Sequence, residues 1–339
     1  MDRYRVNNRI WLGLLIFLCV SQLGCEEAKQ LKLRLKIGVT YAQRVRLISD
    51  LQMFPFPGAD HHDSTMDLKY EVKAVDDQGA ATVRVTIDSI RASMKSLTVS
   101  ASFDSNNDSS DVGSAKTSDI KQRFRRCFTG LKGAGYSAVI DQQGKVVKVF
   151  DVDPRIERIS TGPIIDESVG GHQAAMLLSP HHLREYVSLG MYSAWSRAQP
   201  EPEKSWISYE PVETPRALPV MAKKTFKVDR IKKEKGDRQA VVSFTTAGAL
   251  KRILPQYAQL SGSRAQAEVE IKKIMGVGGK VTFSLSRGRL VRLQEKITAE
   301  IIFPGVGMPP RAPAAKNQPQ KNERKIYYIV DKTIIYLDK

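Results

Sequence analysis

Apolar and polar residues alternate along most of this chain, a pattern that predicts half-buried β-strands. Residues 70–75 alternate in this way, and after the turn residues 76–79 the alternation resumes over residues 81–90. Two alternating runs joined by a short glycine-containing turn predict a β-hairpin. A second hairpin is predicted from residues 136–140 and 145–150, which flank another glycine-containing turn.

The same strand pattern returns in the second half of the chain. Residues 225–231 align with residues 69–75, and residues 288–293 align with residues 144–149. The two matches occur in the same order along the chain, so we predict an internal duplication; the alternative is a chance match between generic hairpins. The predicted fold is therefore mainly β, a β-rich α+β architecture. It has two similar antiparallel domains, each a curved sheet or half-barrel.

A helical pattern separates the two predicted domains. Ser179-Pro180 is suited to begin a helix, because Ser caps the N-terminus and Pro fits the first helical position. Apolar residues follow at helical spacing and predict a helix over about 180–195 that covers an open sheet face. Residues 172–178 are expected to form a shorter helical turn before it.

These elements divide the chain into six parts. They are a signal peptide at 1–25, a first β domain at 30–152, a helical connection at 153–199, a second β domain at 200–303, a Pro-rich flexible segment at 304–323 and C-terminal strands at 324–339. The last part is expected to form two strands on either side of a turn at Asp331-Lys332 and to complete a sheet.

The first 25 residues have the features of an export signal. Three Arg precede an apolar run at residues 10–20, which is too short to span a bilayer but typical of a signal-peptide core. Gly24-Cys25 then resembles the end of a bacterial lipobox, and in that resemblance Cys25 becomes the lipid-modified first residue of the mature chain. Gln22 and Leu23 depart from the usual motif. A conventional signal peptide cut near Cys25 and an uncleaved single anchor therefore stay open as alternatives.

Composition and charge narrow the expected partners. The chain of 339 residues is 42% hydrophobic, too apolar for a fully disordered protein, and its net charge is +17. Loss of residues 1–24 removes three Arg and one Asp and lowers this charge to +15. A basic exported protein is expected to be attracted to anionic lipid. Nucleic acid is not an expected partner, because the basic residues are scattered and no nucleic-acid-binding motif is present.

Candidate catalytic and metal-binding residues form no recognisable constellation. The five His, at 61, 62, 172, 181 and 182, lack the spacing of metal ligands. Ser137 lies in G-x-S-x-V, without the second Gly of a nucleophile elbow. Cys127 is expected to be a buried or half-buried residue of a strand. We expect no metal, no cofactor and no enzymatic activity, with a hydrolase that uses Ser137 as a weaker alternative.

Several of these segments together resemble a family of uncharacterised bacterial secreted proteins and lipoproteins of the planctomycete type. The resemblance rests on Gly24-Cys25, Lys36-Ile37-Gly38-Val39-Thr40-Tyr41, Phe103-Asp104-Ser105 and the hairpin glycines Gly144 and Gly288. It covers most of residues 30–303 and supplies no catalytic residues. It implies an exported protein of the cell envelope, a periplasmic or outer-membrane lipoprotein, with a secreted protein as the alternative. By a looser analogy of fold, such lipoproteins resemble half-barrel carriers of lipoproteins or lipids.

Two functional hypotheses follow. A curved sheet with a covering helix can leave an apolar concave face suited to an acyl chain. The first hypothesis is a lipid-anchored, non-enzymatic envelope protein that binds lipid, a lipoprotein or another hydrophobic component. It predicts an apolar cavity lined by Val83, Val85, Val139 and Phe283. The alternative is a structural or protein-interaction lipoprotein with filled cores, in which these residues pack closely and an exposed patch lies elsewhere. The sequence does not predict the oligomeric state.

Overall fold

The computed structural model describes ten stretches of the chain. They are residues 35–54, 59–107, 120–142, 144–160, 170–187, 205–214, 218–246, 270–287, 289–303 and 324–337. The predicted signal peptide with Cys25 and the Pro-rich segment 304–323 lie outside these residues, so both stay predictions. None of the helices in the described stretches combines the length and the apolar character needed to cross a membrane.

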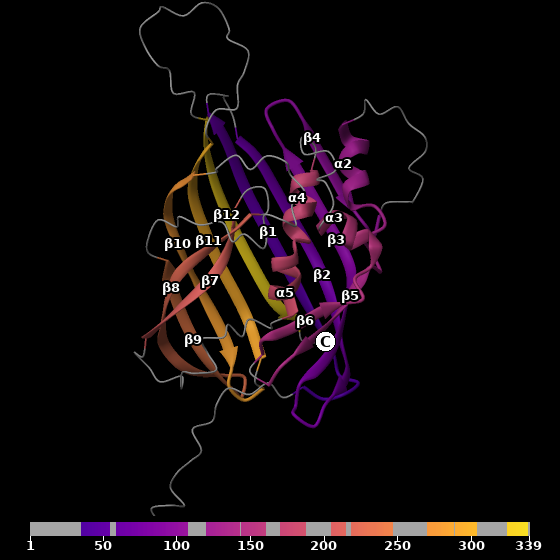
Figure 1. Ribbon diagram of the computed structural model, residues 1–339, viewed down its shortest axis with the longest axis vertical. Coiled ribbons are helices and arrows are strands. Elements are labelled where there is room, and N and C mark those ends of the chain that lie inside the picture. The colour runs from indigo at the N-terminus through magenta and orange to yellow at the C-terminus, as the bar shows by residue number, and fades with distance from the viewer. Residues whose placement is uncertain are drawn as a thin grey trace, which may run out of the picture.

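Most of the described chain is one antiparallel sheet of twelve strands. The strands are β1 (Thr40–Phe54), β2 (Ala59–Val75), β3 (Ala81–Lys95), β4 (Ser100–Asp104), β5 (Gly135–Ile140), β6 (Val146–Phe150), β7 (Ser205–Thr214), β8 (Leu218–Glu234), β9 (Asp237–Thr246), β10 (Glu270–Ser284), β11 (Arg289–Phe303) and β12 (Arg324–Leu337). Their order is β6-β5-β3-β2-β1-β12-β11-β10-β9-β8-β7, and β4 pairs with β3 off this path. The prediction of a mainly β, curved-sheet fold is confirmed (Figure 1).

Eleven of the twelve strands form two five-stranded meanders joined by β12. Strands β1-β2-β3-β5-β6 form the first meander and β7-β8-β9-β10-β11 form the second. Strand β12 pairs with β1 on one side and with β11 on the other. Both predicted hairpins of the first half are present, as the β2–β3 and β5–β6 pairs.

The C-terminal segment corrects one prediction. Residues 324–337 are one continuous strand, and Asp331-Lys332 is not a turn. Lys332 pairs with Leu47 of β1 and with Glu295 of β11, so the chain is held on both sides at this point. Two ladders of backbone hydrogen bonds outweigh the local turn preference of a charged dipeptide.

Two β-bulges fall at positions that the sequence alignment pairs. The β2–β3 register shifts between Val72 and Ala74, and the β8–β9 register shifts between the aligned Val228 and Arg230. The β5–β6 pair skips Val147, and the β10–β11 pair skips the aligned Val291. Because bulges are specific features of a strand plan, the matching registers favour an internal repeat. The repeat and the boundaries of the two domains remain predictions.

The sheet is strongly curved, and its concave side is the inner face. Strands β9 and β10 separate β8 from β11, so in a flat sheet β8 and β11 would lie about 14 Å apart. Yet the Nζ atom of Lys224 on β8 lies 2.7 Å from the Oε1 atom of Glu295 on β11. Both side chains therefore reach toward each other across the concave side of the sheet.

Four helices of the described residues lie on this inner side (Figure 1). They are α2 (Ile120–Phe128), α3 (Pro154–Ser160), α4 (Gly171–Leu177) and α5 (Pro180–Val187). Helix α5 begins at Pro180 as predicted, and the Ser179 hydroxyl caps it by accepting the His182 N–H at 3.1 Å. Within residues 170–187 the helix extends to Val187; the rest of the predicted range lies outside the described residues.

Helix α2 corrects the prediction for Cys127. This residue is not in a strand but is buried on α2, where its thiol donates to the Arg123 carbonyl at 3.4 Å. The apolar positions Ile120, Phe124, Cys127 and Phe128 repeat at helical spacing, which is the signal that was missed. Phe128 stacks on Phe103 of β4 with 5.8 Å between ring centroids, so the helix packs on the sheet through this stripe.

Candidate functional site

Helices α4 and α5, with the capping residue Ser179 between them, form a short helical insert that lies against the inner face of the sheet. In the first meander, helix α4 contacts β2, and helix α5 contacts β5 and β6. The sheet surface beneath it is apolar, because the alternate residues Met66, Leu68, Tyr70 and Val72 of β2 are all buried. The insert covers this surface with its own apolar residues Leu177, Leu183 and Val187, which are also buried.

Two sheet tyrosines hold the C-terminal end of α5. The Tyr136 hydroxyl donates to the Leu183 carbonyl at 2.8 Å, and the Tyr70 hydroxyl donates to the Tyr186 carbonyl at 3.1 Å. Both hydroxyls therefore bind backbone carbonyls of α5 and attach the helix to β5 and β2. Burial raises the pKa of both tyrosines well above 10, so the hydroxyls remain donors at neutral pH.

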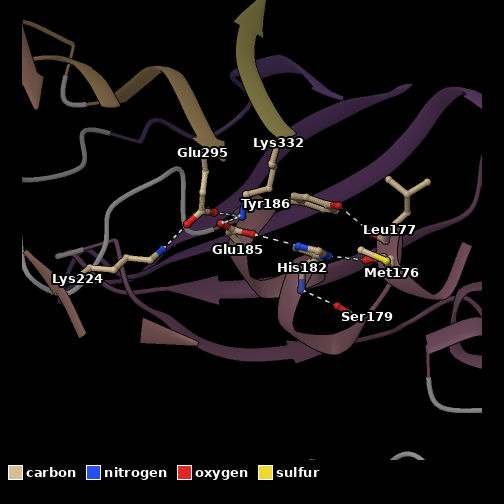
Figure 2. A network of polar contacts seen from close by, with 9 residues as sticks. All are labelled: Met176, Leu177, Ser179, His182, Glu185, Tyr186, Lys224, Glu295 and Lys332. Atoms are coloured by element: carbon tan, nitrogen blue, oxygen red, sulfur yellow. Dashed lines mark hydrogen bonds and ion pairs between the residues drawn. The ribbon is translucent and has the colours of Figure 1, made fainter. Parts of the chain in front are cut away.

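The insert is also tied together internally. The Tyr186 hydroxyl donates to the Leu177 carbonyl at 2.9 Å, and His182 Nδ1 donates to the Met176 carbonyl. Both carbonyls belong to the last turn of α4, so side chains of α5 complete the hydrogen bonding of the preceding helix. Figure 2 shows these contacts around His182 and Tyr186.

A buried row of alternating charges joins the insert to the second meander. We call Lys224, Glu295, Lys332 and Glu185 the ion ladder (Figure 2). Lys224 Nζ lies 2.7 Å from Glu295 Oε1, Lys332 Nζ lies 2.7 Å from Glu295 Oε2, and Lys332 Nζ lies 2.6 Å from Glu185 Oε1. All four side chains are at most 6% exposed. The two cations and two anions balance, as buried charges require.

The electrostatics of the ion ladder favour its charged form. Burial alone would raise the pKa of Glu185, but Lys332 and His182 lower it more, to about 2. Burial likewise opposes ionisation of Glu295, and Lys224 and Lys332 overcome it and hold its pKa well below the usual range. Burial would lower the pKa of Lys332, whereas Glu185 and Glu295 raise it. The ion ladder therefore stays ionised at neutral pH.

Helix α4 has a polar tie of its own to the first meander. The Gln173 amide Nε2 donates to the Ser64 hydroxyl and to the Ser93 carbonyl, the latter at 3.3 Å. His62 Nδ1 donates to Gln173 Oε1 at 3.2 Å, and burial lowers the pKa of this His. Together with the tyrosines and the ion ladder, these bonds fix the insert to β2, β3, β5 and β12.

The aromatic residues of the second meander stack beside the ion ladder. Trp206 and Phe226 stack with 5.3 Å between ring centroids, and Phe226 meets Phe244 at the same distance. Lys224 Nζ lies 5.0 Å from the centroid of Phe244, a cation–π contact. The ion ladder thus borders an apolar inner face on both of its ends.

The structure also places the residues that the sequence analysis singled out. Ser137 accepts a hydrogen bond from Arg84 at 3.3 Å, and in the described part of the chain no imidazole lies within hydrogen-bond distance of it. His182 belongs to the insert, His62 contacts Gln173, and His61 lies 2.7 Å from Asp50. No group of three or more metal-ligating side chains occurs among the described residues.

Three of the four residues proposed to line a cavity are packed in the core, and Val139 lies on the opposite face of the sheet. Val83, Val85 and Phe283 are 3%, 0% and 1% exposed, and Val139 is half-buried. The ion ladder was not predicted from the sequence. Its signal is a charged residue at an inward position of an alternating strand: Lys224 shares a face with Phe226, Glu295 with Leu293 and Lys332 with Ile334.

Comparisons with known proteins give no family. No family model matches the chain, and no curated protein matches it. A solved structure of lipovitellin, concerned with lipid–protein interactions, covers 90% of this chain with a TM-score of 0.43 and 8% identity. A DUF1329 family protein from Desulfovibrio piger covers 87% of this chain, and 85% of its own chain is matched, with a TM-score of 0.16 and 6% identity.

The chain spans only 26% of the lipovitellin chain that it matches. Both TM-scores are too low to transfer a fold or a function to this chain.

Proposed function

We propose that this chain is an exported protein of the bacterial cell envelope, tethered to the membrane through a lipid on Cys25, that binds lipid or another hydrophobic envelope component without catalysis. Cys25 precedes the first described residue, Leu35, by ten positions, so the tether would join the sheet through a short segment. The helical insert is the part of the fold that a hydrophobic ligand would displace.

The observation that carries the proposal is that two short helices, α4 and α5, cover an apolar part of the inner face. The sheet surface beneath the insert is apolar and extends across both meanders. The insert above it consists of helices of seven and eight residues. Isolated helices of this length are not stable in water, so the insert depends on its apolar packing against the sheet and on its polar ties to it. A cover of this kind can open without disrupting the strand ladders, and an acyl chain would then replace its apolar contacts.

A second function is favoured by a specific observation. The close packing of Val83, Val85 and Phe283 is what the filled-core alternative predicts, because a protein that acts only through its surface keeps its core occupied. In that case the chain is a structural or protein-interaction lipoprotein, and the insert is a permanent part of its core.

Native mass spectrometry separates the two functions. Residues 26–339 include every described element and would be purified from a bacterial envelope, then measured alone and after incubation with phospholipid. A stoichiometric lipid adduct supports ligand binding. A bare mass in both measurements contradicts it and favours the filled core.

Glu185→Gln sharpens this experiment because it weakens the tie between the insert and Lys332 while preserving the shape of the side chain. We expect more lipid adduct with this variant than with the wild type. Asp63→Asn is the matched control: it removes a carboxylate that pairs with Arg46 on the outer face, 2.7 Å away, and should leave lipid uptake unchanged.

The tether is tested separately by metabolic labelling with a fatty acid. The wild-type chain should incorporate the label, and Cys25→Ser should not. Equal labelling of the two proteins would show that Cys25 is not the acylated residue.

A further inference from the structure

The outer, convex face of the second meander carries a cluster of exposed cations. They are Lys223, Lys227 and Arg230 on β8, Lys280 on β10, and Arg292 and Lys296 on β11. We call these six residues the basic face. Their strand neighbours, such as Phe226 and Leu293, are buried on the inner face, so the alternation of the strands directs the cations outward.

The strand registers place these cations close together. Lys227 and Lys280 are each paired with Ser243 of β9, and Arg230 and Arg292 lie in the next outward row, joined through Val241 and Thr282. Neighbouring strands are about 4.8 Å apart, so the backbones of Lys227 and Lys280 lie about 10 Å apart and those of Arg230 and Arg292 about 14 Å apart. The basic face is therefore a cluster of positive charge on β8, β10 and β11, with β9 between β8 and β10.

The outer face of the first meander differs in that two of its cations form bidentate ion pairs with carboxylates of the same face. Arg44 forms a bidentate pair with Asp67, and Arg46 forms one with Asp63. The six cations of the basic face form no ion pair within the described part of the chain. Two carboxylates lie beside the basic face: Asp229, which accepts a hydrogen bond from Ser243 at 2.7 Å, and Asp331 of β12, which is the register partner of Lys296.

Two exposed apolar side chains border the basic face. Ile207 and Tyr209 on edge strand β7 are 54% and 65% exposed. Trp206 of the same strand points to the other face and stacks on Phe226. Tyr209 is paired with Lys223, and Ile207 is paired with the next outward residue of β8, Thr225. The apolar pair and the cations thus share one surface.

We infer that the basic face, with Ile207 and Tyr209, docks on the surface of an anionic lipid bilayer. Lys and Arg near such a surface are attracted to the lipid phosphates, and Tyr is favoured at the boundary between headgroups and acyl chains. An exposed Ile gains by entering the acyl region but gains nothing on a nucleic acid, which selects the membrane as the occupant. The inference rests on the proposed function only in that it requires a chain located at a membrane.

Docking through this face would complement the tether. A lipid on Cys25 would hold the chain near the bilayer without fixing its orientation. The basic face would fix how the inner face is oriented toward the bilayer, because Lys and Arg near an anionic surface are attracted to it.

Vesicle cosedimentation tests the inference with the tether removed. Residues 26–339 carrying Cys25→Ser would be mixed with phosphatidylcholine vesicles, with and without phosphatidylglycerol, at low and at high salt. We expect binding only when phosphatidylglycerol is present, and weaker binding at high salt because exposed charges are screened.

Paired charge-reversal variants locate the surface. Lys227→Glu with Lys280→Glu should weaken binding by about tenfold or more, since each cation contributes about one factor of five to membrane affinity. Lys69→Glu with Lys95→Glu makes the same change of charge at exposed positions of the first meander and should have a much smaller effect. Tyr209→Ser should reduce the binding that persists at high salt.

Equal loss in the two double variants would overturn the inference, because binding would then follow net charge and not this surface. Binding to phosphatidylcholine alone, or to DNA but not to anionic vesicles, would also overturn it. If the chain binds vesicles but shows no lipid adduct by native mass spectrometry, docking through the basic face is supported and the proposed ligand uptake is contradicted. If it shows the adduct but does not bind vesicles, uptake is supported and docking through the basic face is contradicted.

Discussion

The two meanders share a strand plan, but their inner faces carry different chemistry. In the first meander Tyr70 and Tyr136 point hydroxyls at the helical insert. The aligned position of Tyr70 is Phe226, and the strand register places Gly279 where the first meander has Tyr136. The second meander therefore has no hydroxyl at either position, and it cannot bind the carbonyls of a helix in the same way.

The second meander contacts the insert through charge instead. Lys224 aligns with Leu68 of the first meander, and both residues are buried. Lys224 needs a buried partner, which Glu295 provides, and Lys332 of the joining strand extends the row to Glu185 on α5. The comparison shows that one strand plan supports two kinds of contact, hydroxyl to backbone and ion to ion, and the substituted inner residues decide which kind forms.

The largest expected effect tests the ionic side of this comparison. Glu295→Gln leaves Lys224 and Lys332 buried without a full counter-charge, and breaking such a pair costs about 3–5 kcal/mol of unfolding free energy. Asp151→Asn, at the aligned position of the first meander, removes an exposed carboxylate and should change stability by less than about 0.5 kcal/mol. Denaturant unfolding of the two variants and the wild type measures both values.

A second substitution makes this test more specific. Lys224→Leu introduces leucine, the residue that the first meander has at the aligned position 68. It also removes the cation that Glu295→Gln leaves unpaired. The double variant should therefore be more stable than Glu295→Gln alone. If the double variant is less stable, the cost does not arise from an unpaired buried cation.

Acid should weaken the ionic contact before it affects the hydroxyl contact. The pKa of Glu185 is lowered from 4.5 to about 2 in the folded chain, so its stabilising contribution is complete above pH 4.5 and is lost as the pH falls toward 2. The pKa of Glu295 is lowered as well, so it contributes in the same direction. Unfolding free energy measured between pH 7 and pH 3 should fall less steeply for Glu185→Gln than for the wild type. Parallel curves would show that Glu185 does not carry this dependence.

The next effect concerns the glycine that replaces Tyr136 in the second meander. A Cβ at Gly279 would lie 2.3 Å from Phe244 Cζ and 2.3 Å from the Gln294 carbonyl, so Gly279→Ala should destabilise the chain by about 1–3 kcal/mol. The neighbouring Gly278 is a matched control, because its added Cβ would meet the Phe244 carbonyl at an ordinary 3.6 Å. Thermal unfolding of the two variants should therefore differ, and equal midpoints would contradict this packing.

Much of the fold could be predicted from the sequence, because hairpins and helix caps are local. The alternation over residues 70–90 predicts the β2–β3 hairpin, and Ser179-Pro180 predicts the start of α5. The continuous strand β12 was missed because its register depends on β1 and β11, both distant in sequence. No local rule reveals that Asp331-Lys332 lies between two hydrogen-bonded neighbours.

The candidate site was harder to predict for the same reason. The insert was expected as a covering helix, but the ion ladder joins residues 147 and 71 positions apart in sequence. Lys224 and Glu295 become partners only because the sheet curves across two intervening strands. Sequence alternation shows that each is on an inward position, and only the three-dimensional curvature pairs them.

The smallest expected effect tests the hydroxyl side of the comparison. Tyr136→Phe converts the first meander toward the second by removing one hydroxyl, and it leaves the Leu183 carbonyl buried without this donor, at a cost of about 1–2 kcal/mol. Tyr209→Phe is the control, since Tyr209 is 65% exposed and should tolerate the change. Hydrogen exchange distinguishes a local effect from a global one. The Tyr136 hydroxyl binds the insert and not the second meander. Amides of α5 should therefore lose protection in Tyr136→Phe, while those of β8 and β9 keep theirs. A uniform loss across both meanders would mean that the hydroxyl stabilises the whole sheet, and the two kinds of contact could then not be separated by region.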